Sequence, residues 1–436
     1  MLYIRALIAA VLIVPGAASA LSLGEALMIA SEQATTLQAL DAETRQAKAQ
    51  HTQSAQAFLP TLSADTTWLR ADSSLITGVP LPAPGRPTSI RPVDLGPIEG
   101  SVTGVQLVQP LFNADALQQR AAAALQVDAR LRAQQWGQQA LRLEVTRQYF
   151  NVLRLRSQQK AAEQSRKAAS QATEMAEASY EQGMVARLDV EQARAELAAT
   201  QAKISHTRAA TKEAEYQVKS LLGIPAGQPL QLDTILPEPA PPNGAGKGST
   251  RNDLEARRLA ARAADQQIRA AEAEWLPRVN LLARQQWARG NEPLDGHADG
   301  WLVAVSLQWT LFDGLGRQGR IAEARADAHK VRTDLEQTRR RIEREQAVAI
   351  SRWQAGYAAW HAAKKSTVAA QRAARLASRR YQENLGSMTD LLTSRARLDQ
   401  AQAALINTRY QAVLAAMNHH LQHGRDPLLA LGKTYQ

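Results

Sequence analysis

The 436-residue sequence predicts a mainly α-helical protein built from two copies of one unit, each with a pair of membrane-type β-strands. Three observations lead to this prediction. A segment recurs about 200 residues later, two helical stretches are unusually long, and four short runs alternate apolar and polar residues.

The clearest sign of duplication is the segment at residues 180–190 (YEQGMVARLDV). It recurs in diverged form at residues 381–391 (YQENLGSMTDL), so that Asp189 and Asp390 lie 201 residues apart. This offset exceeds the roughly 20–50 residues of a solenoid repeat. The chain is therefore predicted to contain two related halves, and its function must suit a pseudo-symmetric molecule.

The chain begins with a segment that is typical of a secretory signal. Arg5 precedes an apolar run at residues 6–14, and Ala18-Ser19-Ala20 supplies the small residues of a cleavage site. We therefore expect residues 1–20 to be a signal peptide. The mature chain is then expected to comprise a first repeat at 21–224, a Pro/Gly-rich connector at 225–250, a second repeat at 251–423 and a C-terminal tail at 424–436.

Composition excludes several classes of function. The chain has no cysteine, so disulfides, thiolate metal sites and a lipid-modified N-terminal cysteine are ruled out. The formal charge of +11 is scattered among acidic residues along the helices, which favours solvated helix faces over a nucleic-acid surface. No catalytic constellation is found, so we expect neither an enzyme nor a cofactor. Residues 314–319 match a dinucleotide fingerprint, but the preceding strand alternates instead of being continuously apolar.

Four short runs alternate in the way that membrane β-strands do, with lipid on one face and water on the other. The clearest is residues 301–311; the others lie at 62–68, at 279–287 and, most weakly, at 105–107. Half of the eight tryptophans fall in these runs, as an interfacial aromatic girdle would require: Trp68, Trp287, Trp301 and Trp309. The alternation alone leaves open a half-buried pair of soluble strands.

Helices are expected over most of the remaining chain. Residues 22–57 predict a first helix, and residues 114–179 and 314–380 could each form one helix of about 65 residues. Return helices are expected at 188–222 and 388–422. A series of residues spaced by seven predicts coiled-coil packing in the first of these: Val190, Leu197, Ile204, Thr211 and Val218.

Specific residues mark the breaks between these elements. Pro60 and Pro277 are expected to stop a helix before a strand, because proline lacks an N–H and disfavours helix in the residue before it. Gly183 is expected to supply a left-handed turn between two helices, and Asn384 to take its place in the second copy. A long exposed loop is expected at about 76–100, and a shorter polar one at 291–300.

Together these residues resemble the TolC-type outer-membrane channel family over essentially the whole mature chain. The most specific match is Tyr180-x-x-Gly183-x-Val185-x-x-x-Asp189-Val190, with Arg194 following, and the Leu-Phe-Asp-Gly sequence at residues 311–314. The resemblance implies a trimer in which each protomer gives four strands to a 12-stranded β-barrel that continues into a long periplasmic α-helical coiled-coil barrel. Independently, four strands cannot close a membrane barrel, which needs at least about eight.

The resemblance also implies a gate at the periplasmic helical tips. By position, Tyr381 and Asp189 correspond to a contact between the repeats, and Asp390 to a carboxylate of the constriction ring. The chain departs from the family at Gly386, where a gating arginine occurs, and at Thr393, where a second ring aspartate occurs. The alternative is that both aspartates are only helix-start charges favoured by the macrodipole.

The expected function is a passive exit duct in the outer membrane that extends into the periplasm. The duct would belong to a tripartite efflux pump or a type I secretion system and would export small molecules or proteins. Expected partners are two further copies of the chain, a periplasmic adaptor (membrane fusion) protein, an inner-membrane pump of the RND or ABC type, and outer-membrane lipid. The alternative is a soluble periplasmic coiled-coil adaptor or scaffold.

A cluster of His419, His420 and His423 stands at the end of the last expected helix. Three imidazoles could in principle ligate Zn or Cu. Their position just before Gly424 favours interaction of the rings with the negative end of the helix dipole, so we expect no metal site.

Overall fold

The computed structural model describes residues 20–71, 98–232, 235–242, 250–290, 296–383 and 385–431. The expected signal peptide, apart from Ala20, and most of the expected loop at 76–100 lie outside these residues. The elements follow one order twice, with a helix, two strands, a very long helix and a return helix in each half. They are α1 (Leu23–Gln33), α2 (Thr35–Gln53), η1 (Ser54–Ala57), β1 (Thr61–Ala71), β2 (Ile98–Phe112), α3 (Ala114–Glu181), α4 (Arg187–Leu222), α5 (Asn252–Ala273), β3 (Arg278–Gly290), β4 (Gly296–Gln308), α6 (Gly316–Gln382), α7 (Met388–Gln422) and η3 (Pro427–Leu431).

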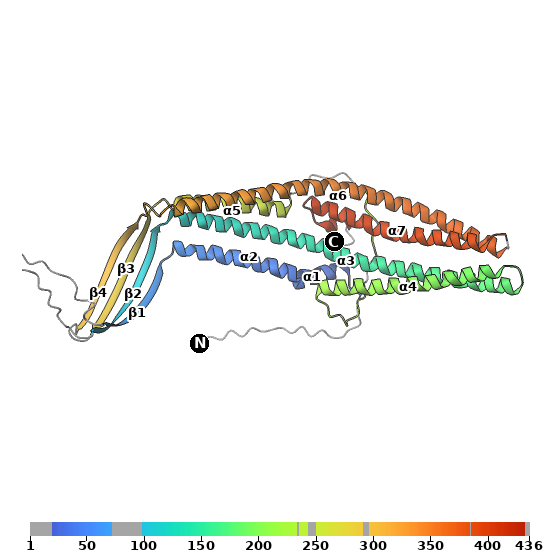
Figure 1. Cartoon of the computed structure of the whole chain (residues 1–436), viewed down its shortest axis with the longest axis horizontal. Helices are drawn as coiled ribbons and strands as arrows, with labels where there is room; N and C mark the ends of the chain where they lie inside the picture. Colours follow the sequence, from blue (N-terminus) through green and yellow to red (C-terminus); the bar gives the residue numbers. More distant parts are fainter. Residues whose placement is uncertain are drawn as a thin grey trace, which may run out of the picture. The chain divides into compact units, whose positions relative to one another are not determined.

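The chain divides into two compact units. One comprises residues 1–42, 131–255 and 336–436, and the other comprises residues 43–130 and 256–335. The second unit contains the sheet, in which the strands follow the order β1-β2-β3-β4 and all neighbours are antiparallel (Figure 1).

The strand register places the predicted apolar residues on one face of the sheet. Leu62 of β1 lies opposite Leu107 of β2, Leu107 lies opposite Ala283 of β3, and Ala283 lies opposite Val303 of β4. Neighbouring side chains on one face are two residues apart along each strand. The apolar residues of the four alternating segments therefore lie together on one face of the sheet.

The opposite face of the sheet is polar. Asp65 of β1 and Arg284 of β3 form an ion pair at 3.0 Å, and Arg284 also donates to Gln106 of β2 at 3.4 Å. Gly104 leaves room for this pair, because a Cβ at its position would lie only 2.9 Å from the Arg284 guanidinium. Apolar and polar faces on one open sheet match the lipid and water sides of a membrane strand.

Two strand predictions need correction. The alternation was weakest and shortest at 105–107, but the strand found there, β2, has 15 residues and pairs with both β1 and β3. We also expected a loop at 291–300, yet Gly296–Gly300 belongs to β4 and pairs with β3, while residues 291–295 lie outside the described part. The small residues around Gly100 and Gly104 hide the alternation that reveals the other strands.

The first helix is also divided, where we expected one helix over residues 22–57. Ala34 is extended (φ −63°, ψ 117°) and separates α1 from α2, which ends at Gln53 before the 3₁₀ turn η1. Ala34 is followed by the β-branched pair Thr35 and Thr36, and β-branched residues are weaker helix formers. A capping box between Ser22 and Glu25 begins α1.

The first unit has a core in which α1, α3, α4, α7 and the connector meet. Its largest fully buried side chains include Tyr149 and Phe150 of α3, and the Tyr149 hydroxyl donates to the carbonyl of Leu21 at 2.8 Å. The connector is packed as well, because Leu230 and Leu236 are buried in this core. The expected C-terminal tail contains η3, whose Leu431 is also buried in the core.

Among the described residues, no helix combines the length and the apolar character that a membrane-spanning helix requires.

Candidate gate at the helical tips

Two helical hairpins, α3 with α4 and α6 with α7, form the candidate site in the first unit. Gly183 adopts φ +71° in the turn between α3 and α4, a left-handed conformation that glycine tolerates best. The corresponding Asn384 lies outside the described residues. The two turns connect the helices that carry Asp189 and Asp390.

Asp390 has a local structural role at the start of α7. Its backbone N–H donates to the Ser387 hydroxyl at 3.1 Å, and the Ser387 N–H donates to its carboxylate at 3.4 Å. The two residues form a capping box that satisfies two of the unpaired N–H groups of the helix start. Asp189 lies in the first turn of α4, where its charge is favoured by the helix dipole.

A small apolar cluster, here called the tip cluster, joins the two hairpins. Met388 and Leu391 of α7 are fully buried in it, and Tyr381 of α6 is 5% exposed. The members from the first hairpin are Ala172 and Ala176 of α3 and Val190 and Ala193 of α4. Burying a side chain of the size of Met or Leu contributes about 1.5–3 kcal/mol, so this cluster stabilises the contact between the two hairpins.

Tyr381 takes part in the cluster through its ring. Burial, and secondarily the nearby charge of Asp189, raises the pKa of the Tyr381 phenol. The hydroxyl has no hydrogen-bond partner among the described residues, and so it does not donate to Asp189. Between Tyr381 and Asp189, which were expected to form a contact between the repeats, the structure thus shows an electrostatic effect and no hydrogen bond from the hydroxyl.

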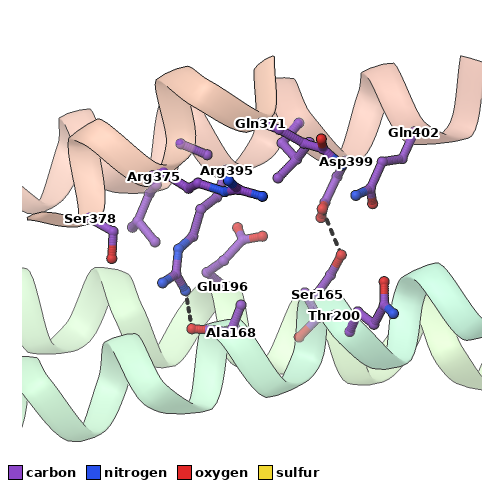
Figure 2. A pocket seen from close by; sticks show the side chains of 15 residues that line it. Ser165, Ala168, Glu196, Thr200, Gln371, Arg375, Ser378, Arg395, Asp399 and Gln402 are labelled. Carbon is purple, nitrogen blue, oxygen red and sulfur yellow. Dashed lines mark hydrogen bonds between the residues drawn. The ribbon is translucent and has the colours of Figure 1, made fainter. Parts of the chain in front are cut away.

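Farther from the tip, polar contacts join α3 of the first repeat to α7 of the second (Figure 2). The Arg395 guanidinium donates to the backbone carbonyl of Ala168, and the Ser165 hydroxyl donates to Asp399 at 2.6 Å. Burial lowers the pKa of Arg395, an effect that Asp399 partly offsets. These contacts border a cavity of about 340 Å³ that is lined by all four helices.

Sequence reasoning missed Arg395, Asp399 and Ser165. The spacing of Arg395 and Asp399, four residues on one helix, is common on solvated helix faces and carries no specific signal. The gate residues expected from the sequence, Tyr381 and Asp189, lie on the same two hairpins as these contacts, and their role in a gate stays a prediction.

The helix-to-strand junctions lie in the second unit. Pro60 immediately precedes β1 and Pro277 immediately precedes β3, after helices that end at Gln53 and Ala273. Arg317 of α6 is 2% exposed and stacks on Trp275 at 4.1 Å from the ring centroid. The stacking joins the segment before β3 to the start of α6, and in the turn from β4 to α6 both Gly314 and Leu315 have positive φ.

The three histidines at the end of α7 pack against one another and against α6. In the part of the chain that the structure describes, no group of three or more His, Asp or Glu side chains is placed to hold a metal ion. His419 is buried instead of lying at the solvated end of α7. It is held there by Trp353, whose ring centroid lies 4.7 Å away.

Comparison with known proteins identifies the family. The model of the outer membrane efflux protein family matches residues 27–224 and 249–418. No curated protein matches the sequence significantly. The fold is similar to that of the outer membrane protein VceC of Vibrio cholerae, with 19% identity and a TM-score of 0.78 over 92% of this chain and 96% of VceC.

Two further structures share the fold. The CmeC outer membrane channel of Campylobacter jejuni has 15% identity and a TM-score of 0.79 over 92% of this chain and 85% of CmeC. The open state of the Neisseria gonorrhoeae MtrE outer membrane channel has 18% identity and a TM-score of 0.75 over 93% of this chain and 89% of MtrE.

The resemblance to TolC-type channels is thus confirmed, and with it a mainly helical fold with a small antiparallel sheet. The family and its structural neighbours are channels, and none of the matches reported above is a soluble adaptor. The protein is an outer-membrane exit duct for efflux that extends into the periplasm. The chain belongs to the outer membrane efflux protein family.

Proposed function

We propose that three copies of the chain assemble into the duct and that their sheets together form a 12-stranded barrel. The observation that supports this most is the apolar face of the sheet, on which Trp301 is 78% exposed and Val305 is 65% exposed in a single copy. Among the described residues, β1 and β4 each pair on one side only. An unpaired strand edge in lipid costs several kcal/mol for each unsatisfied group, so partner strands are needed.

Cysteine cross-linking tests this assembly, since the natural chain has no cysteine to give background. Single cysteines would be placed along β1, at residues 63–67, and along β4, at residues 301–305, and combined in pairs. Oxidation in membranes is expected to give species of two and three chains for some pairs. Cysteine pairs at Gln106 of β2 and Gln285 of β3 are the matched control. Both neighbours of these strands belong to the same chain, so these pairs should not cross-link one chain to another. Absence of any β1–β4 cross-link between chains would contradict the assembly.

The duct is proposed to close at the tips of its two hairpins. Tyr381 acts through its buried ring, Asp189 places a carboxylate close to it, and Asp390 contributes a second carboxylate at the start of α7. Closure is supported by the apolar tip cluster and by the contacts of Arg395 with Ala168 and of Ser165 with Asp399. Opening would have to break both sets of contacts between the repeats.

The tips are also proposed to meet a periplasmic adaptor, through which an inner-membrane pump supplies substrate and energy. Leu188 of α4 is 64% exposed and Leu385 of the second turn is 65% exposed, and exposed apolar residues at neighbouring tips favour a protein partner. We expect a photo-crosslinker at Leu385 to capture an adaptor of the membrane-fusion class in cells. The same probe at Lys203, exposed on α4 away from the turn, should not capture it. Equal capture at both positions would contradict docking at the tips.

A further inference from the structure

The end of α7 carries a group of histidines that the proposed gate does not use. His419 is 2% exposed, and its ring centroid lies 4.7 Å from that of Trp353 on α6 and 4.3 Å from that of His423. The ring of His420 lies 5.8 Å from His419 and 6.1 Å from Trp353. These four rings, here called the imidazole cluster, pack the end of α7 against α6.

The cluster also contacts the chain that links the two repeats. The Trp353 indole N–H donates to the carbonyl of Ala240 at 3.2 Å, and Ala240 lies in the connector. The His423 ring nitrogen Nδ1 lies 2.9 Å from the carbonyl of His419, within the last turn of α7. Packing in the imidazole cluster therefore links α6, α7 and the connector at one point of the first unit.

The buried rings lack the partners that would stabilise a positive charge. Neither ring nitrogen of His419, nor Nδ1 of His420, has a hydrogen-bond partner among the described residues. The groups whose charge acts on His419 are His423, His420 and Arg425, all of which are cationic when charged. A protonated His419 would therefore be repelled by Arg425 and, when they are protonated too, by His420 and His423.

Two carboxylates of the neighbouring segments are engaged in ion pairs elsewhere. Asp426, which follows Arg425, forms an ion pair with Arg142, and Glu345 of α6 forms one with Arg251 at 2.8 Å. Burial, and then the charges of His423, His420 and Arg425, lowers the pKa of His419 to about 4. Burial, followed by the charges of Arg425 and His423, also lowers the pKa of His420.

We propose that the imidazole cluster is an acid-sensitive joint in the helical part of the duct. Neutral rings hold the end of α7 against Trp353, and protonation in an acidified periplasm releases this packing. When the rings are neutral, the cluster keeps the second hairpin attached to the connector. When the rings are charged, the end of α7 separates locally from Trp353. This proposal is independent of how the tips close.

The direction of the pH effect follows from proton linkage. A histidine whose pKa is lower when packed binds fewer protons in the packed state than in the released state, so packing is favoured as pH rises. The stabilisation is complete above pH 6.5, the ordinary value for the ring, and is lost as the pH falls towards 4. At pH 5 the opening equilibrium of His419 should be on the order of 20-fold more favourable than at neutral pH.

Hydrogen–deuterium exchange on the full-length protein in detergent tests the joint. Exchange would be measured at pH 7.5 and pH 5.0 and corrected for the intrinsic pH dependence of amide exchange. Peptides that cover residues 413–425 are expected to lose protection by about tenfold or more at pH 5.0. Peptides from the middle of α4, around the exposed His206, should keep theirs. Unchanged protection of 413–425 in the natural protein would overturn the proposal without any variant.

Two substitutions identify the responsible group. His419→Phe keeps a ring against Trp353 but cannot be protonated, so this variant should lose less protection at pH 5.0 than the natural protein does. His206→Gln removes an exposed histidine on α4 and should leave the acid response intact. The proposal fails if His419→Phe loses protection at pH 5.0 as the natural protein does. Neither measurement depends on trimer assembly or on conductance, so failure here would be distinct from failure of the proposed duct.

Discussion

Arg395 of α7 donates a hydrogen bond to the backbone carbonyl of Ala168 in α3, and so joins the second repeat to the first (Figure 2). One helical turn farther along α7, Asp399 accepts a hydrogen bond from Ser165 of α3. Residues four apart share a face of a helix, so one face of α7 makes both contacts. The tip cluster lies nearer the turn, and the hairpins are thus joined by an apolar layer and a polar one.

Arg395→Ala should make the closed duct leakier. The substitution removes a hydrogen bond from a charged donor, which contributes about 1.5–3 kcal/mol, and leaves the Ala168 carbonyl without this partner. We expect higher single-channel conductance in planar bilayers and greater sensitivity of cells to large antibiotics. Arg397→Ala, at an exposed position of the same helix, is the matched control. Equal conductance of the two variants would count against a role of the polar contacts in closure.

Tyr381→Phe and Tyr381→Ala should behave differently. The hydroxyl has no partner among the described residues, so its removal should change stability by no more than about 1 kcal/mol and leave the conductance unchanged. Loss of the whole ring creates a cavity in the tip cluster, which costs about 3–5 kcal/mol and should raise the conductance. If Tyr381→Phe opened the duct as far as Tyr381→Ala, the hydroxyl and not the ring would hold the gate.

The two roles of Asp390 can be separated by substitution. Asp390→Asn keeps an oxygen that can accept the Ser387 N–H but removes the charge, so it should weaken cation selectivity with little effect on stability. Asp390→Ala removes charge and cap together, and loss of a cap costs about 0.5–2 kcal/mol. Reversal potentials in a salt gradient and thermal unfolding read out the two effects. Unchanged selectivity in both variants would leave Asp390 with only its capping role.

Substitutions on the two faces of β4 should differ in their effect on membrane insertion. Val305 lies on the apolar face, where arginine costs about 2–4 kcal/mol near the bilayer midplane. Ser306, its neighbour, lies on the polar face. Val305→Arg should therefore reduce the amount of folded protein in outer-membrane fractions, whereas Ser306→Arg should not. The opposite ranking would mean that the faces are assigned the wrong way round.

The sequence predicts those features that follow from local periodicity. The alternation at Trp301, Val303 and Val305 identified β4 and its apolar face, and the length without proline identified α3 and α6. Periodicity gave a weak signal where small residues interrupt it, as at Gly100 and Gly104 in β2. It gave no signal at Ala34, where neither proline nor glycine marks the break.

Contacts between helices were predicted less well. The tip hairpins could be located from the repeated segment, but Arg395, Ser165 and Asp399 meet only because of how α3 and α7 are rotated about their axes. That rotation depends on packing between segments more than 200 residues apart. His419 was expected to cap the end of a helix, and its burial against Trp353 depends on the same kind of distant packing.

The molecular mass of the purified mature protein tests the central claim most directly. Light scattering coupled to size-exclusion chromatography in detergent, with the detergent contribution subtracted, should give three times the mass of one mature chain. Without detergent the protein should aggregate, because the apolar face of its sheet meets water. A stable single chain in plain buffer would contradict the claim that this sheet is completed by further copies in a membrane.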